Sequence, residues 1–411
     1  MTGCAAVAVA SDLHGAEIVE KLVASLDPIL AAASVHRVPS TSYAPITEPF
    51  ACLVLTGGTE RAILAVHAQR NAMVEGEPLL LLAHADHNSL PAALEAAALL
   101  RLEGHRVQIV VCGIGTNART LHDAVHNVSV WHDMRRARVG LLGTASDWLV
   151  ASSPDRDAFH RVWGSTLVDL DLGSAIESVH ATTSVPLATP VRIGAKHNLN
   201  APSAPEVDSA ARFDTVLQQI VERENLDAVT VRCFDLIRAA GTSGCLALSA
   251  VNDRGVIAGC EGDIASTIGL LWSRQLVGKL GWMANPAMID RATGVVELAH
   301  CTVPLSLTTS YALHTHFESG KGVGIVGELP VGPATLLRLG GQGLAQLWCA
   351  EGEALRTHGR VERCRTQLDV RIDPSEAGEL LDRPLGNHLI VIAGHHGDQL
   401  RKWWSQTMKP R

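Results

Sequence analysis

Residues 255–267, GVIAGCEGDIAST, place two carboxylates between an apolar strand and a helix. The run GVIAG does not alternate with polar residues, which is typical of a strand buried on both faces of a parallel sheet. Glu261 and Asp263 follow it in a glycine-containing turn, and residues 264–280 have a helical pattern. Ligands of α/β sheets bind outside the carboxyl ends of the strands. This stretch therefore predicts an α/β fold with an acidic site at the edge of a parallel sheet.

The rest of the chain predicts two α/β domains and one β domain. Short apolar runs alternate with helical patterns over residues 1–138, and a second series of the same kind covers residues 139–285. We interpret these as two consecutive Rossmann-like domains, the second of which carries the acidic turn. Residues 286–411 contain strands separated by glycine and proline turns, which predicts a mainly antiparallel β domain with a final helix.

Composition narrows the classes of function. The 411 residues are too many for one compact core. The formal net charge of −8 and the lack of a long basic block argue against nucleic acid as a partner. No apolar run reaches the roughly 18–20 residues that a membrane span needs. The cysteine count is odd, at 9, and there is no CxxC pair. Reduced thiols in a cytoplasmic protein are therefore expected.

The acids suggest a metal site. Asp235 follows the predicted strand AVTVRCF, and Glu261 and Asp263 follow GVIAG. Two neighbouring strands that end in carboxylates, joined by one imidazole, would suit Mn²⁺ or a similar divalent ion. Asp263 has a second interpretation as the N-cap of the next helix, a role in which asparagine would serve about as well. Glu261 is then the stronger ligand candidate.

Other polar groups at predicted strand ends are candidates for binding. The turn LTGGTE at residues 55–60, which contains Thr59, could hold sugar hydroxyls or a phosphate, or could simply connect a strand to a helix. His14, His84 and His87 also lie near strand ends. His314 and His316 would share one face of a strand, which suits either a site or a solvated surface.

Several of these segments resemble the L-fucose and L-arabinose isomerase superfamily, in the same order and over nearly the whole chain. The similar segments include AGCEGDIAST, RCFDL, VVELAHCTVPL, LHTHFESGKGVGIVGELPVGPATLLRL and PLGNHLIVIAGHHGDQLRKW. The resemblance implies a fucose isomerase-like fold and an aldose–ketose isomerase that uses Mn²⁺ and a cis-enediol intermediate.

The resemblance also implies roles for individual residues. Asp235 and Glu261 would be catalytic carboxylates on the metal, His388 would be the imidazole ligand, and Asp263 would compete with Glu261. The sugar would contact a further set of residues: His300, His316, His14, His87 and Thr59. A homo-oligomer is implied as well, with the active site near a subunit interface and histidines contributed by a neighbouring N-terminal domain.

Some features depart from the superfamily and leave the substrate open. RCFDL has aspartate where glutamate is usual, and no histidine lies near Met288. The sugar could be a plain deoxyhexose or pentose, or a modified anionic sugar such as sulfoquinovose. Arginine far outnumbers lysine, which would permit an anion-binding arginine. A cytoplasmic sugar-binding or regulatory relative without catalysis is the alternative outside the enzymes.

Overall fold

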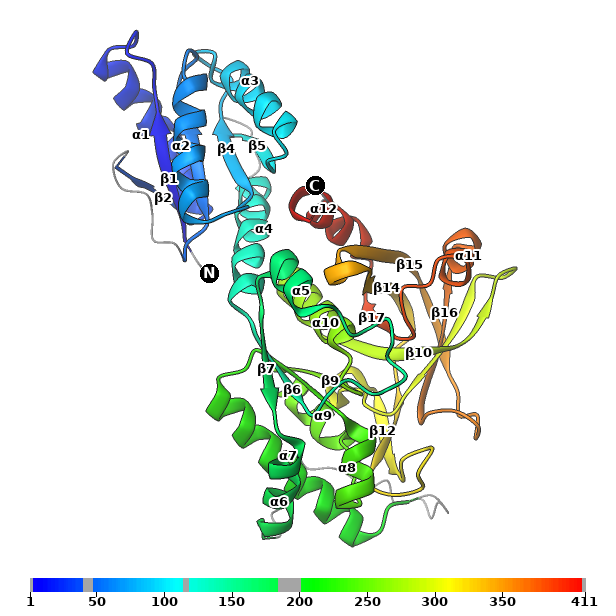
Figure 1. Ribbon diagram of the computed structural model, residues 1–411. Coiled ribbons are helices and arrows are strands. Elements are labelled where there is room, and N and C mark those ends of the chain that lie inside the picture. The colour runs from blue at the N-terminus through cyan, green and yellow to red at the C-terminus, as the bar shows by residue number, and fades with distance from the viewer. Residues whose placement is uncertain (1–2, 40–46, 114–117, 184–200, 409–411) are drawn as a thin grey trace. The chain divides into compact units, whose positions relative to one another are not determined.

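The computed structural model describes residues 3–39, 47–113, 118–183 and 201–408. The chain forms two compact units, one of residues 1–133 with 402–411 and one of residues 134–401. Figure 1 shows the helices and strands of both units.

The first unit is built on a five-stranded parallel sheet in the order β2-β1-β3-β4-β5. Its strands are β1 (Cys4–Val9), β2 (Val35–Val38), β3 (Phe50–Val54), β4 (Leu79–Ala83) and β5 (Val107–Val111). The helices are α1 (Ala16–Ala32), α2 (Glu60–Met73), α3 (Ser89–Leu102) and α4 (Ala118–Arg136). Alternate residues of β1 enter two different cores, because both faces of the sheet are covered.

The second unit begins with a four-stranded parallel sheet in the order β7-β6-β8-β9. The strands are β6 (Arg138–Leu142), β7 (Thr166–Leu170), β8 (Ala228–Val231) and β9 (Ile257–Cys260). Among the described residues, the helices that accompany them are α5 (Arg156–Trp163), α6 (Leu172–Ala181), α7 (Ala204–Glu224), α8 (Cys233–Ala240), α9 (Cys245–Asp253) and α10 (Ile264–Val277).

A closed antiparallel barrel completes the second unit, in the order β10-β11-β16-β15-β14-β17. Its strands are β10 (Gly281–Asp290), β11 (Val295–His300), β14 (Gly332–Gly340), β15 (Gln346–Thr357), β16 (Thr366–Ile372) and β17 (Leu389–Ala393). A hairpin of β12 (Ser310–His314) and β13 (Gly324–Glu328) lies outside this ring. The last helices are α11 (Pro374–Asp382) and α12 (Gly397–Thr407).

Helix α10 packs against both sheets of the second unit. It contacts β8 and β9 of the parallel sheet, and β10, β14 and β17 of the barrel. Almost all of its residues are buried, as expected for a helix with apolar residues on every side. A Cβ atom at Gly269 would lie 2.5 Å from Cδ1 of Ile390, so the small residue permits this close approach. Helix α10 is therefore held between the two sheets.

The fold class predicted from the sequence is confirmed at the level of architecture: two parallel-sheet α/β parts precede an antiparallel β part. The three-domain division at residues 138 and 285 stays a prediction, and the antiparallel strands begin at Gly281. Within the described ranges, no helix is long and apolar enough to cross a membrane.

Candidate metal centre and adjoining cavity

The turn between β9 and α10 directs Glu261 and Asp263 toward different partners. Glu261 has a φ of +63° and Gly262 a φ of +72°, so the chain turns sharply directly after the strand. A Cβ atom at residue 262 would lie 2.6 Å from the carbonyl oxygen of Thr144, which requires glycine. Asp263 then begins the helix, and its carboxylate accepts the Ser266 N–H at 2.7 Å.

Three potential ligand atoms converge at Glu261. The Nε2 atoms of His300 and His388 lie 3.7 and 3.6 Å from Oε1 of Glu261. The three atoms all lie within 4.8 Å of one another, and the three residues are buried. Oε2 of Glu261 accepts a hydrogen bond from the indole N–H of Trp148 at 2.7 Å, which fixes the carboxylate plane.

A second set of contacts orients the two imidazoles. Nδ1 of His388 lies 2.8 Å from Oδ2 of Asp263, and Nδ1 of His300 lies 2.8 Å from the hydroxyl of Thr302. In both rings these contacts leave Nε2 directed toward Glu261. Nε2 of His388 is buried and forms no hydrogen bond. A carboxylate partner on the far nitrogen, as His388 has in Asp263, is typical of histidines that bind metal.

Asp263 is completely buried and is neutralised by a buried arginine. Arg338 on β14 lies 3.2 Å from Oδ2 of Asp263 and is only 1% exposed. Its guanidinium also donates to the hydroxyl groups of Ser266 and Ser152. Asp263 thus caps α10, pairs with Arg338 and orients His388. Its oxygens are not among the atoms that converge at Glu261.

The pKa values of Glu261, Asp263 and His388 are shifted both by burial and by neighbouring charges. Burial raises the pKa of Glu261, but His300 and His388 outweigh it and hold that pKa well below its usual range. The pKa of Asp263 is lowered in the same way, because Arg338 and His388 outweigh the effect of burial. Burial alone would lower the pKa of His388, but Asp263 and Glu261 raise it to about 9. Both carboxylates are therefore ionised.

The residues fit a divalent cation. Two imidazole nitrogens and one carboxylate oxygen form a donor set that first-row divalent ions accept, and the buried Nε2 of His388 forms no hydrogen bond that a cation would have to replace. A bound cation would also offset the buried negative charge of Glu261. His300 was predicted to line the sugar site, whereas the structure brings it into this trio.

The structure does not bring Asp235 into the trio. Strand β8 ends at Val231, and Asp235 lies in the first turn of α8 rather than at the end of the strand. Its carboxylate pairs with Arg232 and, at 3.4 Å, with Arg238. The strand that was expected through residue 234 stops early because the helical pattern CFDLIRAA begins at Cys233.

A cavity of about 380 Å³ adjoins Glu261. Its lining consists of two aromatic residues, two amides, two acids and one arginine: Trp148, Phe234, Asn285, Asn387, Glu261, Glu318 and Arg238. The rings of Trp148 and Phe234 meet edge to face at 4.9 Å. The buried ring of His316 also meets Phe234 edge to face, with centroids 5.6 Å apart. No local sequence pattern identified the two amides or Trp148 as cavity residues, because they come from loops and strands far apart in the chain.

In the first unit, the remaining predicted residues follow the ends of β1, β3 and β4. The rings of His14 and His87 meet edge to face at 5.4 Å. Thr59 is buried, and its hydroxyl donates to the carbonyl oxygen of Thr56 at 2.7 Å. The order of the sheet reverses between β1 and β3, which is where ligands of such sheets bind. The substrate-binding role of these three residues stays a prediction.

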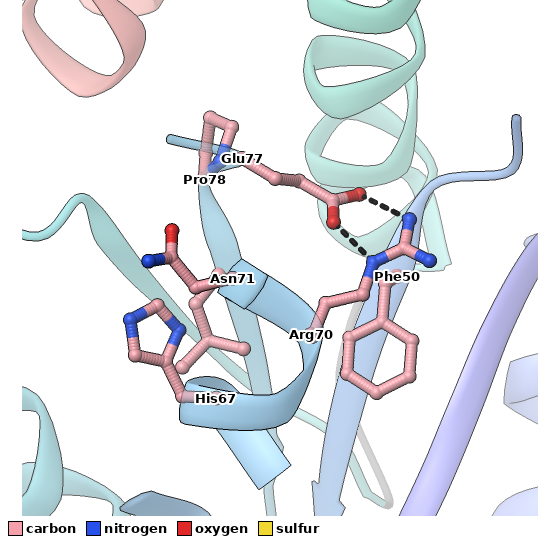
Figure 2. A pocket seen from close by; sticks show the side chains of 7 residues that line it. Phe50, His67, Arg70, Asn71, Glu77 and Pro78 are labelled. Atoms are coloured by element: carbon pink, nitrogen blue, oxygen red, sulfur yellow. Dashed lines mark hydrogen bonds and ion pairs between the residues drawn. The ribbon is translucent and has the colours of Figure 1, made fainter. Parts of the chain in front are cut away.

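A small pocket elsewhere in the first unit has a structural explanation. Figure 2 shows the guanidinium of Arg70 facing the carboxylate of Glu77, with an N–O distance of 3.0 Å for one of the two bonds. Arg70 also lies over the ring of Phe50, and His132 contacts Glu77 at 2.6 Å. The cavity holds about 10 Å³, room for one water molecule. These buried charges satisfy one another and leave no space for a larger ligand.

A second trio of potential ligands is also explained by ion pairs. In the described ranges, Glu297, His358 and Asp369 form the one other group with metal-ligand spacing. Arg356 pairs with Asp369, and Arg360 and Arg363 pair with Glu297. Three guanidinium groups already neutralise the two carboxylates, so a cation would be repelled there.

Comparison with known proteins points to sugar isomerases. No model of a known protein family matches the chain. Three similar curated proteins are each named sulfoquinovose isomerase. That of Clostridium sp. (strain MSTE9) is 24% identical over 273 residues, which are 64% of this chain and 58% of that protein. That of Alkalicoccus urumqiensis is 22% identical over 280 residues, 66% of this chain and 63% of that protein. That of Priestia megaterium (strain ATCC 12872 / QMB1551) is 23% identical over 219 residues, 52% of this chain and 49% of that protein. The chain thus spans less than two thirds of the length of these relatives.

Proposed function

We propose that this chain is a divalent-metal-dependent aldose–ketose isomerase and that its substrate is a sulfonated hexose, with sulfoquinovose as the first candidate. The observation that carries the proposal is the convergence of Glu261 Oε1 with the Nε2 atoms of His300 and His388 at the wall of a sugar-sized cavity. The names of the three relatives support both the reaction and the sugar.

Glu261, His300 and His388 would hold the cation, for which Mn²⁺ is our candidate. Such an ion would act as a Lewis acid toward the two substrate oxygens, O1 and O2. Asp263 and Thr302 keep the imidazoles oriented, and Trp148 keeps the Glu261 carboxylate oriented.

The reaction needs no oxidant or reductant. A C2–H bond breaks, the proton is delivered to C1, and a second proton moves between O2 and O1. Glu261 is the proposed base for the carbon-bound proton, because it faces the cavity and is ionised. Asn285 and Asn387 line the same cavity and offer amide donors and acceptors to sugar hydroxyls. Trp148 and Phe234 offer an apolar wall.

The proposal is tested with protein reconstituted with Mn²⁺ and incubated with sulfoquinovose in D₂O. We expect the corresponding ketose to form, with solvent deuterium at C1 or C2 visible by NMR, and we expect a chelator to stop the exchange. The neutral hexoses and pentoses of the superfamily serve as comparison substrates. Absence of exchange with every sugar, in folded protein that contains metal by elemental analysis, would leave the sugar-binding alternative in its place.

We also propose that the chain works as a homo-oligomer, as the resemblance implies. Sedimentation at assay concentration tests this, since an active monomer would contradict it.

A further inference from the structure

We propose that Arg238 binds the sulfonate group of the substrate and makes the cavity selective for an anionic sugar. This inference rests on the proposed function and names the residue that would recognise the charged end of the substrate. Among the described residues that line the cavity next to Glu261, Arg238 is the one cationic side chain.

Helix α8 presents Arg238 to the cavity together with an aromatic ring. Phe234 and Arg238 are one turn apart on this helix, so their side chains lie on the same face. Both line the cavity, and the Phe234 ring packs against the rings of Trp148 and His316. The guanidinium therefore extends from a fixed wall of the cavity.

Asp235 holds Arg238 only weakly. Oδ2 of Asp235 is taken by Arg232, whose guanidinium is also bound by Thr144, Ala145 and Asp147. The remaining oxygen, Oδ1, lies 3.4 Å from Arg238. Within the described part of the chain, Asp235 is the one group that pairs with Arg238. The Arg238 side chain is 74% exposed, whereas Arg232 is 14% exposed. Most N–H groups of Arg238 are thus open to a ligand.

A guanidinium suits a sulfonate. A sulfonate is ionised at every physiological pH and has three acceptor oxygens, and the planar arginine head can bind two of them at once. The cavity offers Glu261 for the reacting carbons and the amides of Asn285 and Asn387 for hydroxyl groups. Arg238 adds a positive charge that a neutral sugar would not use.

Glu318 is also in the lining and carries the opposite charge. The cavity therefore does not attract anions through its overall field. Selectivity must come from direct contact with Arg238, which makes the contact testable by substitution.

The test compares Arg238→Met, Arg238→Lys and the matched control Arg383→Met. Arg383 is 75% exposed and forms a helical ion pair with Glu379, but it does not line the cavity. Each protein is assayed with sulfoquinovose and with 6-deoxyglucose, its neutral counterpart. We expect Arg238→Met to lower the ratio of kcat/KM for the sulfonated over the neutral sugar about 10-fold, mainly through KM. Lysine should restore part of that loss, and Arg383→Met should leave the ratio unchanged.

Direct binding separates this inference from the proposed function. If the wild-type protein turns over neither sugar, the isomerase proposal fails, and calorimetry with sulfoquinovose still tests the subsite. Binding that weakens about 10-fold in Arg238→Met supports the subsite. An unchanged preference or affinity in Arg238→Met, or a wild-type protein that does not bind sulfoquinovose, overturns it.

Discussion

Replacing Asp263 with asparagine distinguishes a simple helix cap from a residue that organises the site. Asparagine caps helices about as well as aspartate, so a cap alone predicts little loss. In the structure, Oδ1 of Asp263 accepts the Ser266 N–H, while Oδ2 accepts from His388, Arg338 and the Ser266 hydroxyl. If the asparagine oxygen keeps the cap, its NH₂ group replaces Oδ2 and faces these donors.

The loss of stability expected for Asp263→Asn follows from the burial of the ion pair that it breaks. Arg338 and Asp263 are 1% and 0% exposed, so removing the carboxylate leaves a buried guanidinium without its counter-charge. Breaking a buried pair in this way costs about 3–5 kcal/mol. At the lower end of that range, the unfolding transition of the second unit should fall by about 6–12 °C. His388 also loses the partner of its Nδ1, for which we expect metal affinity to drop about 10- to 100-fold.

Scanning calorimetry of the metal-free protein and a metal-binding titration measure the two effects. Asp155→Asn is the matched control, because Asp155 caps α5 through Ala158 and is exposed. That variant should lose less than about 0.5 kcal/mol. Equal stability and equal metal affinity in the two variants would refute this account of Asp263.

Three more predictions concern the same site. Glu261→Gln keeps the size of the side chain but removes a ligand charge and the proposed base, so kcat should fall about 100-fold or more. Elemental analysis should also show less bound metal. A variant that keeps both its kcat and its metal content contradicts the assignment. Asp235→Asn should retain its metal, because Arg232 and Arg238 occupy its carboxylate. It should not lower the preference for sulfonated over neutral sugar, because the lost carboxylate holds Arg238 only weakly and would compete with a sulfonate for it. Loss of metal would favour the ligand role predicted from the sequence. The pKa of His388 is raised to about 9 from an ordinary value of 6.5, so its contribution to stability is complete below pH 6.5 and is lost as the pH rises through 9. Between pH 6.5 and pH 9 the metal-free protein should become less stable. Its metal affinity should increase over the same interval, because only the neutral imidazole binds metal. Urea unfolding and metal titration at several pH values measure the two trends, and the opposite trend in stability or in affinity would contradict the prediction.

Most of the fold could be predicted from local sequence patterns. The apolar run GVIAG became β9, and the run after it became α10, because continuous apolar stretches mark elements that are covered on all sides. The segment VVELAH, in the region predicted to form antiparallel strands, became β11 and ends at His300. Asp235 shows the limit: the sequence placed it at a strand end, but α8 begins at Cys233.

Only part of the candidate site could be predicted from the sequence. Glu261 and His388 were identified from the acidic turn and from the resemblance, and the structure brings them together. The position of His300 in the trio depends on how β11 pairs in the barrel, which no local pattern reveals. The pairing of Asp263 with Arg338 spans 75 residues and had no sequence signal. Contacts of this kind are decided by tertiary packing, so one sequence does not predict them.

The distance along the chain between Asp263 and its partners has a consequence for biosynthesis. Arg338 follows it by 75 residues and His388 by 125. While the ribosome is still making the barrel, the parallel sheet of the second unit can form its strands, but its Asp263 has no counter-charge. Burying that carboxylate alone is strongly unfavourable. The nascent sheet should therefore keep the start of α10 open to water until β14 has been made. Closure of the centre then becomes a late event in the synthesis of each molecule, and the proposed metal would bind only after nearly the whole second unit has left the ribosome.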